Sequence, residues 1–259
     1  MRLRQIRNAT VVVECAGTRL LVDPWLDDKG AGFTAQSPWP ERNVPSPLVE
    51  LPCPVGEVLE GVDAVVVTHV HPGHFGRRDA ALIDHALPVF VQSEADADVV
   101  AGWGFADVRV LLDEGMPFGA QCLVRVPAQH GLTPRLDCGP AMGVVVQAPG
   151  EPTLYVAGDT VWYAGVGQVL ERFRPDVTVL NCCGATTATR GRIIMDEEDL
   201  LRVCEAAPFT HVVASHLDAV NHGRVSRPYL RALMDRMGFG AQVSVPADGE
   251  WLEFGCRPA

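Results

Sequence analysis

The sequence lacks any apolar run approaching the roughly 18 to 20 residues that a membrane-spanning helix needs. We therefore expect no membrane partner. The N-terminal segment is basic and then strand-like, without an apolar stretch followed by a small-residue cleavage site, so we expect no signal peptide and a cytoplasmic location. Basic side chains are scarce, with 21 Lys and Arg against 32 Asp and Glu. Because phosphate binding needs clustered basic residues, nucleic acid is not an expected partner.

Two further absences narrow the chemistry. The eight cysteines include no Cys-x-x-Cys pair, and without an export signal we expect them to be reduced thiols. The glycine pair at Gly165 and Gly167 lacks the third glycine of a dinucleotide-binding loop. Of the 259 residues, 47% are hydrophobic and 20% charged, which indicates a globular protein with a substantial core. We expect a single domain over 1–259; whether it forms a homo-oligomer stays open.

Short apolar runs alternate with segments of helical spacing along most of the chain. A long segment from Asp23 to about Glu57 is rich in proline; its aromatic residues either wall a pocket or pin a surface loop. The remaining pattern predicts two packed sheets with helices outside. The expected strands are 10–14 and 19–22 as a hairpin, 64–67, 89–92, 108–112, 121–126, 143–147, 153–157, 177–180, 211–214, 242–245 and 251–254; the expected helices are 77–85, 93–102, 163–172, 196–206 and 226–238.

Three of the eight histidines lie within six positions, directly after the expected strand 64–67. They are His69, His71 and His74, in the segment Thr68-His69-Val70-His71-Pro72-Gly73-His74. Imidazole is the commonest metal ligand in proteins, and three imidazoles on one loop at a strand end can converge on a point. The segment therefore predicts a metal site.

Other side chains of the metal-ligand type also follow expected strands. His130, Asp159 and His216 come after the strands 121–126, 153–157 and 211–214, respectively. Each alone is commonly a structural histidine or a turn residue. Their repeated placement at strand ends favours one shared site, because strand ends on one edge of a sheet form a rigid base for flexible loops. His85 and His211 lack this placement and are predicted to be structural.

The ordered set Thr68-His69-x-His71-x-x-His74, His130, Gly158-Asp159-Thr160 and His216 resembles the metallo-β-lactamase superfamily over nearly the whole chain. Further segments resemble the branch that includes L-ascorbate-6-phosphate lactonase: Arg7–Thr10, Val22–Pro24, Ala157–Tyr163 and Asn221-His222. The resemblance implies an αββα sandwich, that is, two mixed β-sheets with helices on both outer faces. It also implies a first metal on His69, His71 and His130, and a second on His74, Asp159 and His216, with Asp159 bridging.

One position departs from the pattern of the superfamily, His-x-His-x-Asp-His, because Gly73 stands where the aspartate is usual. Three hypotheses follow: one tight metal site, a second ion bound more weakly, or loss of hydrolytic chemistry. Loss of an anionic ligand favours one tight divalent metal, with the second site weakened or absent. We expect zinc first, with manganese or iron as alternatives.

The resemblance and the ligand set predict a metal-dependent hydrolase that acts on a small ester, lactone or phosphoester. Asp159 is expected to orient the attacking water, and His222 is a candidate acid or substrate contact, with a capping or exposed role as the alternative. Because of Gly73, two other classes stay open. One is a non-hydrolytic metalloenzyme, such as a lyase or isomerase, and the other is a metal-containing binding protein.

Several neighbouring residues allow more than one interpretation. Trp162 and Tyr163 either line the pocket or fasten the next helix to the sheet. Arg190 and Arg192 either bind an anionic group or are solvated. A thiolate at Cys182 or Cys183 would be a replacement ligand or a nucleophile, but buried small apolar residues are the favoured interpretation.

Overall fold

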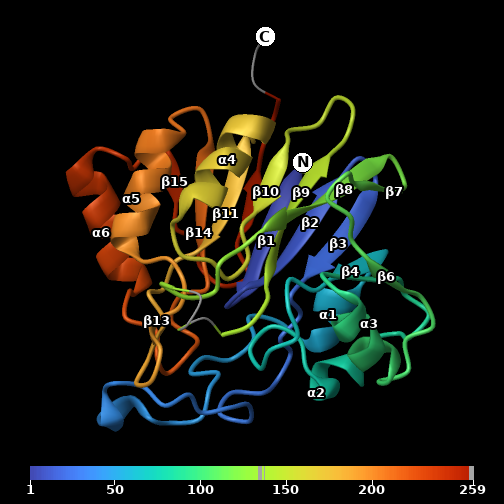
Figure 1. Cartoon of the computed structure of the whole chain (residues 1–259), viewed down its shortest axis with the longest axis horizontal. Helices are drawn as coiled ribbons and strands as arrows, with labels where there is room; N and C mark the ends of the chain where they lie inside the picture. Colours follow the sequence, from blue (N-terminus) through green and yellow to red (C-terminus); the bar gives the residue numbers. More distant parts are fainter. Residues whose placement is uncertain (134–135, 137, 257–259) are drawn as a thin grey trace.

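The computed structural model describes residues 1–133, 136 and 138–256 and contains two mixed β-sheets of seven strands each (Figure 1). The first sheet is antiparallel from β16 to β3 and parallel from β3 to β6. In spatial order its strands are β16 (Trp251–Glu253), β1 (Arg2–Arg7), β2 (Thr10–Cys15), β3 (Thr18–Val22), β4 (Ala64–Val66), β5 (Val89–Val91) and β6 (Val108–Val110).

The second sheet has the same division between parallel and antiparallel strands. It is parallel from β15 to β10 and antiparallel from β10 to β7. In spatial order its strands are β15 (Val243–Ser244), β14 (His211–Ser215), β11 (Val177–Asn181), β10 (Leu154–Val156), β9 (Met142–Gln147), β8 (Gln121–Pro127) and β7 (Met116–Phe118). A separate ribbon pairs β12 (Thr186–Thr187) with β13 (Gly191–Arg192).

The apolar side chains of the strands form three layers, one between the two sheets and one under the helices on each outer face. In β2, Val11 and Val13 belong to a cluster that also contains Val144 and Val146 of β9, so this cluster fills the space between the sheets. Val12 belongs instead to a cluster with residues of the helices on the outer face. Successive side chains of a strand point to opposite faces, so an apolar residue at every position requires cover on both sides.

Helices supply that cover on both outer faces, and the expected αββα sandwich is confirmed (Figure 1). The first sheet is covered by α1 (Val55–Leu59), α2 (Arg77–Ala80) and α3 (Glu94–Ala101). The second is covered by α4 (Ala164–Phe173), α5 (Glu197–Ala206) and α6 (Arg227–Met237). None of the helices in the described part of the chain is both long and apolar enough to cross a membrane.

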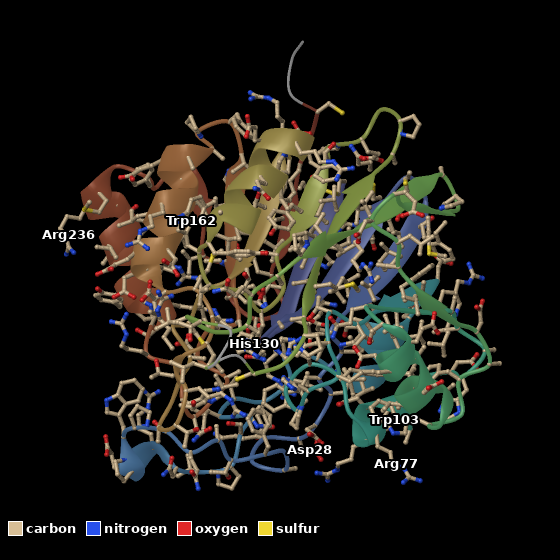
Figure 2. All side chains as sticks on the ribbon, viewed as in Figure 1. Asp28, Arg77, Trp103, His130, Trp162 and Arg236 are labelled. Carbon is tan, nitrogen blue, oxygen red and sulfur yellow. The ribbon has the colours of Figure 1, made fainter. Side chains whose placement is uncertain are left out.

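Most of the expected elements are present, including the hairpin of β2 and β3. The helix expected over 77–85 is shorter, because α2 ends at Ala80 and turns follow. The polar stretch before Arg192 contains the ribbon of β12 and β13, which the sequence did not predict. The segment between β3 and α1 contains one 3-10 turn, Pro40–Arg42, and passes along the lower edge of the sandwich in Figure 1. His130 lies at this same edge, between the two halves (Figure 2).

Candidate metal centre

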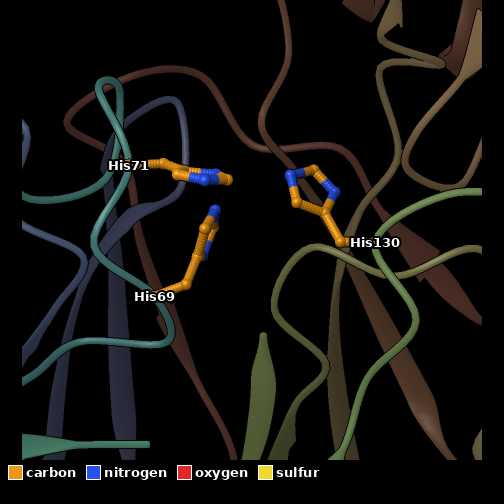
Figure 3. A group of neighbouring side chains, drawn as sticks. All are labelled: His69, His71 and His130. Atoms are coloured by element: carbon orange, nitrogen blue, oxygen red, sulfur yellow. The ribbon is translucent and has the colours of Figure 1, made fainter. Parts of the chain in front are cut away.

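Three imidazole rings meet at the edge of the sandwich, and they come from both sheets. His69 and His71 follow β4 of the first sheet, and His130 follows β8 of the second. Figure 3 shows the three rings turned toward one another across the gap between the two loops. One nitrogen from each lies within 4.8 Å of the others, a spacing that one ion can bridge. The three ligands expected for the first metal are therefore together.

Hydrogen bonds fix which nitrogen of His69 faces this space. Thr68 donates its hydroxyl hydrogen to Asp23 Oδ2 at 2.7 Å, so its oxygen accepts a hydrogen from His69 Nδ1 at 3.0 Å. The lone pair of neutral His69 is then on Nε2, which is fully buried and has no hydrogen-bond partner among the described residues. A buried acceptor without a partner is costly, and a bound cation would satisfy it.

His130 is oriented in the same way, because its Nδ1 lies 3.0 Å from the carbonyl oxygen of Ile193. A carbonyl only accepts, so Nδ1 carries the hydrogen and Nε2 carries the lone pair. Burial lowers the pKa of His69 well below its usual range and that of His71 to about 4. Both rings are therefore neutral at pH 7, which is the form that binds a metal. The donor set fits a divalent cation.

Asp159 follows β10 and lies at the centre of the histidine cluster. Its Oδ2 is 3.1 Å from His74 Nε2, 3.5 Å from His130 Nε2 and 3.9 Å from His69 Nε2. Burial alone would raise its pKa, but the electrostatic interaction with the neighbouring imidazoles, His74 first, and the hydrogen bond with His74 hold the pKa of this carboxyl well below its usual range. Asp159 is therefore an anion that faces the candidate metal ligands.

His74 lies between two buried carboxylates. Its Nδ1 is 2.9 Å from Asp23 Oδ2, and its Nε2 faces Asp159. Burial opposes a charge here, yet Asp159 and Asp23 together raise the pKa of His74 to about 10 in the metal-free protein. His74, His69 and Asp159 form a second group whose ligand atoms lie within 4.8 Å of one another.

His216 follows β14 and lies between Asp159 and Asn8. Its Nε2 is 3.9 Å from Asp159 Oδ1 and 3.1 Å from the side-chain nitrogen of Asn8. It belongs to neither group of atoms that could hold one ion. All six expected ligands thus lie in one cluster, but they are not equivalent.

Three residues to which the sequence assigned no site role complete this cluster, although two of them, Asn8 and Asp23, lie in segments that carry the family resemblance. Asp23 accepts hydrogen bonds from the backbone and the hydroxyl of Thr68 and faces His74. Asn181 donates a hydrogen bond to Asp159 Oδ1 at 2.8 Å, so the other carboxylate oxygen, Oδ2, faces the histidines. Asn8 lies in the turn between β1 and β2 and donates to the carbonyl oxygen of Gly73. Asp23 and Asn181 stand at strand ends, the signal that pointed to His130 and Asp159.

The cluster forms the floor of a cavity of about 300 Å³. Its walls are largely apolar and include Phe33, Ala35, Pro72, Ile193 and Val220. Phe33 comes from the long segment before α1, so this segment walls the pocket, one of the two roles considered for it.

His222 also lines the cavity, and its tautomer is fixed by its neighbour. Asn221 donates its amide hydrogens to the carbonyls of Ala35 and Arg42, so its Oδ1 is an acceptor and faces His222 Nδ1 at 3.4 Å. Burial lowers the pKa of His222 to about 4. The ring is therefore neutral at pH 7 and carries its lone pair on Nε2.

Other candidates are placed outside the metal centre. Arg190 lines the cavity mouth, whereas Arg192 pairs with Asp196 and Asp199 beside α5. Trp162 and Tyr163 pack against the cluster under the second sheet's helices, which is the fastening role.

Cys182 and Cys183 are buried thiols, and His85 and His211 bond groups outside the metal centre. Burial raises the pKa values of the Cys182 and Cys183 thiols, so both are protonated, and Cys183 Sγ lies 3.4 Å from His216 Nδ1. His85 bonds the carbonyl of Ala80, and His211 bonds the hydroxyl of Ser244, as expected for structural residues.

The sequence model described as the beta-lactamase superfamily domain matches residues 18–217. The chain belongs to the beta-lactamase superfamily. The UPF0173 protein YddR of Bacillus subtilis (strain 168) is 38% identical over 98% of this chain and 100% of its own length. The superfamily expected from the histidine motif is confirmed, and the finer resemblance to the lactonase branch stays a prediction.

Two solved structures are similar over almost their entire length. An isothiocyanate hydrolase from Delia radicum gut bacteria is 37% identical, with a TM-score of 0.93 and coverage of 99% of this chain and 100% of that one. A possible metal-dependent hydrolase from Veillonella parvula DSM 2008 is 34% identical, with a TM-score of 0.92 and coverage of 97% and 98%.

Proposed function

We propose that the protein is a metal-dependent hydrolase of a small, uncharged electrophile. The observation that carries this proposal is the buried, unpartnered Nε2 of His69, which faces the same space as His71 and His130. The names of relatives support it, since the Methanocaldococcus jannaschii protein MJ1163 is called a UPF0173 metal-dependent hydrolase and is 28% identical over 152 residues.

Zinc is the first expectation for the ion, because three neutral imidazoles and one carboxylate suit it, with manganese or iron as alternatives. His69, His71 and His130 would hold the ion, with Asp159 beside it. A bound divalent cation lowers the pKa of water to about 7 for zinc and polarises an electrophile.

Asp159 and His222 have separate roles in this proposal. Asp159 is anionic, and Asn181 occupies its Oδ1, so Oδ2 accepts a proton from the attacking water and orients it. His222 presents an unprotonated Nε2 to the cavity, so it accepts a hydrogen bond from the water or from an N–H of the reacting group. A neutral ring in this tautomer cannot act as the general acid.

The cavity favours a small substrate with an apolar body. Arg190 is the single basic side chain, Lys or Arg, among the described lining residues, and it is exposed at the mouth of the cavity. A phosphoester would place its charge against an apolar wall and beside Asp159, so esters, lactones and uncharged heterocumulenes fit better. The 37% identical isothiocyanate hydrolase makes an isothiocyanate the first substrate to test.

The reaction would consume one water and one isothiocyanate. The water oxygen bonds to the central carbon of R–N=C=S. The bond between this carbon and the nitrogen breaks, and both water hydrogens end on the nitrogen. The products are R–NH₂ and carbonyl sulfide. Asp159 takes the two protons from the oxygen in turn and delivers each to the nitrogen, while His222 holds the hydrogen-bonding group in place.

Purified protein loaded with zinc should be assayed against an aryl isothiocyanate, p-nitrophenyl acetate, a small lactone and p-nitrophenyl phosphate. We expect turnover of the isothiocyanate, weaker turnover of the ester or lactone, and none of the phosphate. The His71→Ala variant should lose zinc and activity together. A fully loaded protein that converts none of the four overturns the proposal; binding without conversion would then indicate a binding protein, and rearrangement without uptake of water a lyase or isomerase.

A further inference from the structure

Asn8 is held rigidly at the edge of the metal centre. Its backbone carbonyl accepts hydrogen bonds from Gln5 Nε2 at 2.8 Å and His216 N at 2.9 Å, and it lies 2.9 Å from Ser215 Oγ, which also faces Gln5 Oε1. Its φ of 54° is in the left-handed region, where asparagine and aspartate are tolerated better than other side chains. The backbone thus fixes where the side chain can reach.

The amide of Asn8 uses both of its hydrogens. Nδ2 is 2.9 Å from the carbonyl oxygen of Gly73, which only accepts, so the amide nitrogen must be the atom placed there. The same Nδ2 is 3.1 Å from His216 Nε2, so the second amide hydrogen of Asn8 can be donated to His216. His216 therefore accepts at Nε2 and donates from Nδ1 to Cys183 Sγ. Both nitrogens of His216 have protein partners.

A side chain at position 73 is disfavoured by the backbone and by Phe33. Its φ is +97°, a conformation that side-chain-bearing residues rarely adopt. A Cβ built there would lie 3.0 Å from Phe33 Cε1 and 3.9 Å from Asn8 Nδ2. A side chain at position 73 would therefore be strained by the backbone and would have to displace the Phe33 ring by a few tenths of an ångström, with the Asn8 amide in ordinary contact.

We propose that Asn8 closes the second metal position and so limits the centre to one tightly bound ion. This inference rests on the proposed function, since it takes His69, His71 and His130 as a metal centre. An N–H donor repels a cation, and it occupies the lone pair of His216 that a second ion would need. The number of ions is therefore set at position 8, which lies far from the histidine motif in sequence.

The isosteric change Asn8→Asp tests this assignment. It replaces the donor by an anionic acceptor next to His216, His74 and Asp159, and aspartate tolerates the positive φ. We expect native mass spectrometry of zinc-loaded protein to count one ion on the wild type and two on Asn8→Asp. Gly73→Asp, the direct restoration of the motif, should still carry one.

Asn8→Gly is the matched control, because it removes the donor without adding a carboxylate and also accepts the positive φ. It should bind one ion tightly and a second ion at least tenfold more weakly in a zinc titration, a second binding step that the wild type lacks. Circular dichroism and thermal melting confirm that each variant is folded.

The possible outcomes separate this inference from the proposed function. A wild type that binds no zinc overturns the proposed function. A wild type with two equally tight ions, or Asn8→Asp with one, overturns the inference and leaves the function intact. Nitrogen NMR of histidine-labelled wild type needs no variant: in the zinc-loaded protein His216 should keep hydrogen on Nδ1 and no metal on Nε2, and a metal-bound His216 would refute the assignment.

Discussion

Asp23 shows how one residue outside the metal ligands can orient several of them. Its Oδ2 accepts from the Thr68 hydroxyl and faces His74 Nδ1, and Thr68 in turn fixes the ring of His69. It is 1% exposed, so its charge is screened by these contacts rather than by water. Such partners of metal ligands fix the tautomer and the ring orientation. Asp23 is therefore a positioning residue.

Loss of the His222 ring should reduce turnover without removing the metal. We expect His222→Phe to lower kcat/KM by about 10- to 100-fold, because a hydrogen bond to the reacting groups in a desolvated site contributes about 1.5–3 kcal/mol. His222→Gln, which retains an acceptor, should lose less. Because the folded pKa of His222 is about 4, its protonation should not cause a fall in kcat/KM near pH 6.5.

The matched control for this prediction is His211→Gln. His211 is half-buried and bonds Ser244 on the strands away from the cavity, so its replacement should leave kcat/KM unchanged. Zinc content should be equal in all variants. Equal activity of His222→Phe and wild type would show that the ring has no part in turnover.

The histidines of the site were predictable, whereas their partners were only partly so. His130, Asp159 and His216 follow apolar runs, and a sequence shows strand ends directly. Asp23 and Asn181 obey the same rule and were within its reach. Phe33 lies in the proline-rich segment that was already a candidate pocket wall. The role of Asn8 was not within reach, because it depends on distances to Gly73 and His216, which only the packing of distant segments sets.

At the level of single elements, β10 of the second sheet carries a buried hydroxyl group, that of Tyr155, without a hydrogen-bond partner among the described residues. Burial raises the pKa of this hydroxyl. Removing an unpaired buried polar group while keeping the ring should stabilise the protein. We expect Tyr155→Phe to increase the free energy of unfolding by about 1 kcal/mol, measured by urea denaturation.

Tyr163→Phe is the control for this change, since Tyr163, which directly precedes α4, is only partly buried. It should change the free energy of unfolding by less than about 0.5 kcal/mol. A loss of stability in Tyr155→Phe would mean that a buried water bonds the hydroxyl, contrary to the prediction.

The elements that the sequence predicted well share a strong local signal. Asp196 caps α5 by accepting from the backbone of Glu198 and Asp199, and the capping residue was visible before the structure. Gly238 ends α6 with a φ of 81°, as the expected end of that helix required. The ribbon of β12 and β13 was missed because two-residue strands with polar side chains have no hydrophobic period.

At the scale of the whole molecule, the candidate metal ligands come from loops of both sheets. His69 and His71 belong to the first sheet and His130 to the second, so a bound ion would link both halves. At a free zinc concentration of about 100 times Kd, binding adds about 2.7 kcal/mol. For a protein of this size that corresponds to a Tm roughly 5–10 °C higher than with chelator.

Thermal melting with and without chelator checks this expectation, and His71→Ala provides the control. The variant lacks one ligand, so chelator should leave its Tm unchanged. An identical Tm for loaded and chelated wild type would show that the ion, if bound, does not stabilise the fold.

The metal-free protein should lose stability as the pH falls from about 6.5 to about 4. Burial lowers the pKa of three histidines to about 4, so unfolding lets them bind protons in this interval: His71, His216 and His222. Two buried carboxyls, Asp79 and Asp248, act in the opposite direction, because their pKa values are raised to about 6 and the folded state binds their protons first. They are fewer than the three histidines, so we expect a net loss of stability.

His74 acts in a different pH range from the other site histidines. Its pKa is raised to about 10 in the folded state, so the stability it adds is complete below pH 6.5 and is lost as the pH rises toward 10. Urea midpoints of chelated protein should therefore be highest near pH 6.5 and fall on both sides. His74→Gln should flatten the alkaline side and keep the acid side, because the acid loss arises in His71, His216 and His222. A midpoint that rises on acidification to pH 4 would contradict the neutral state of these three rings in the folded protein.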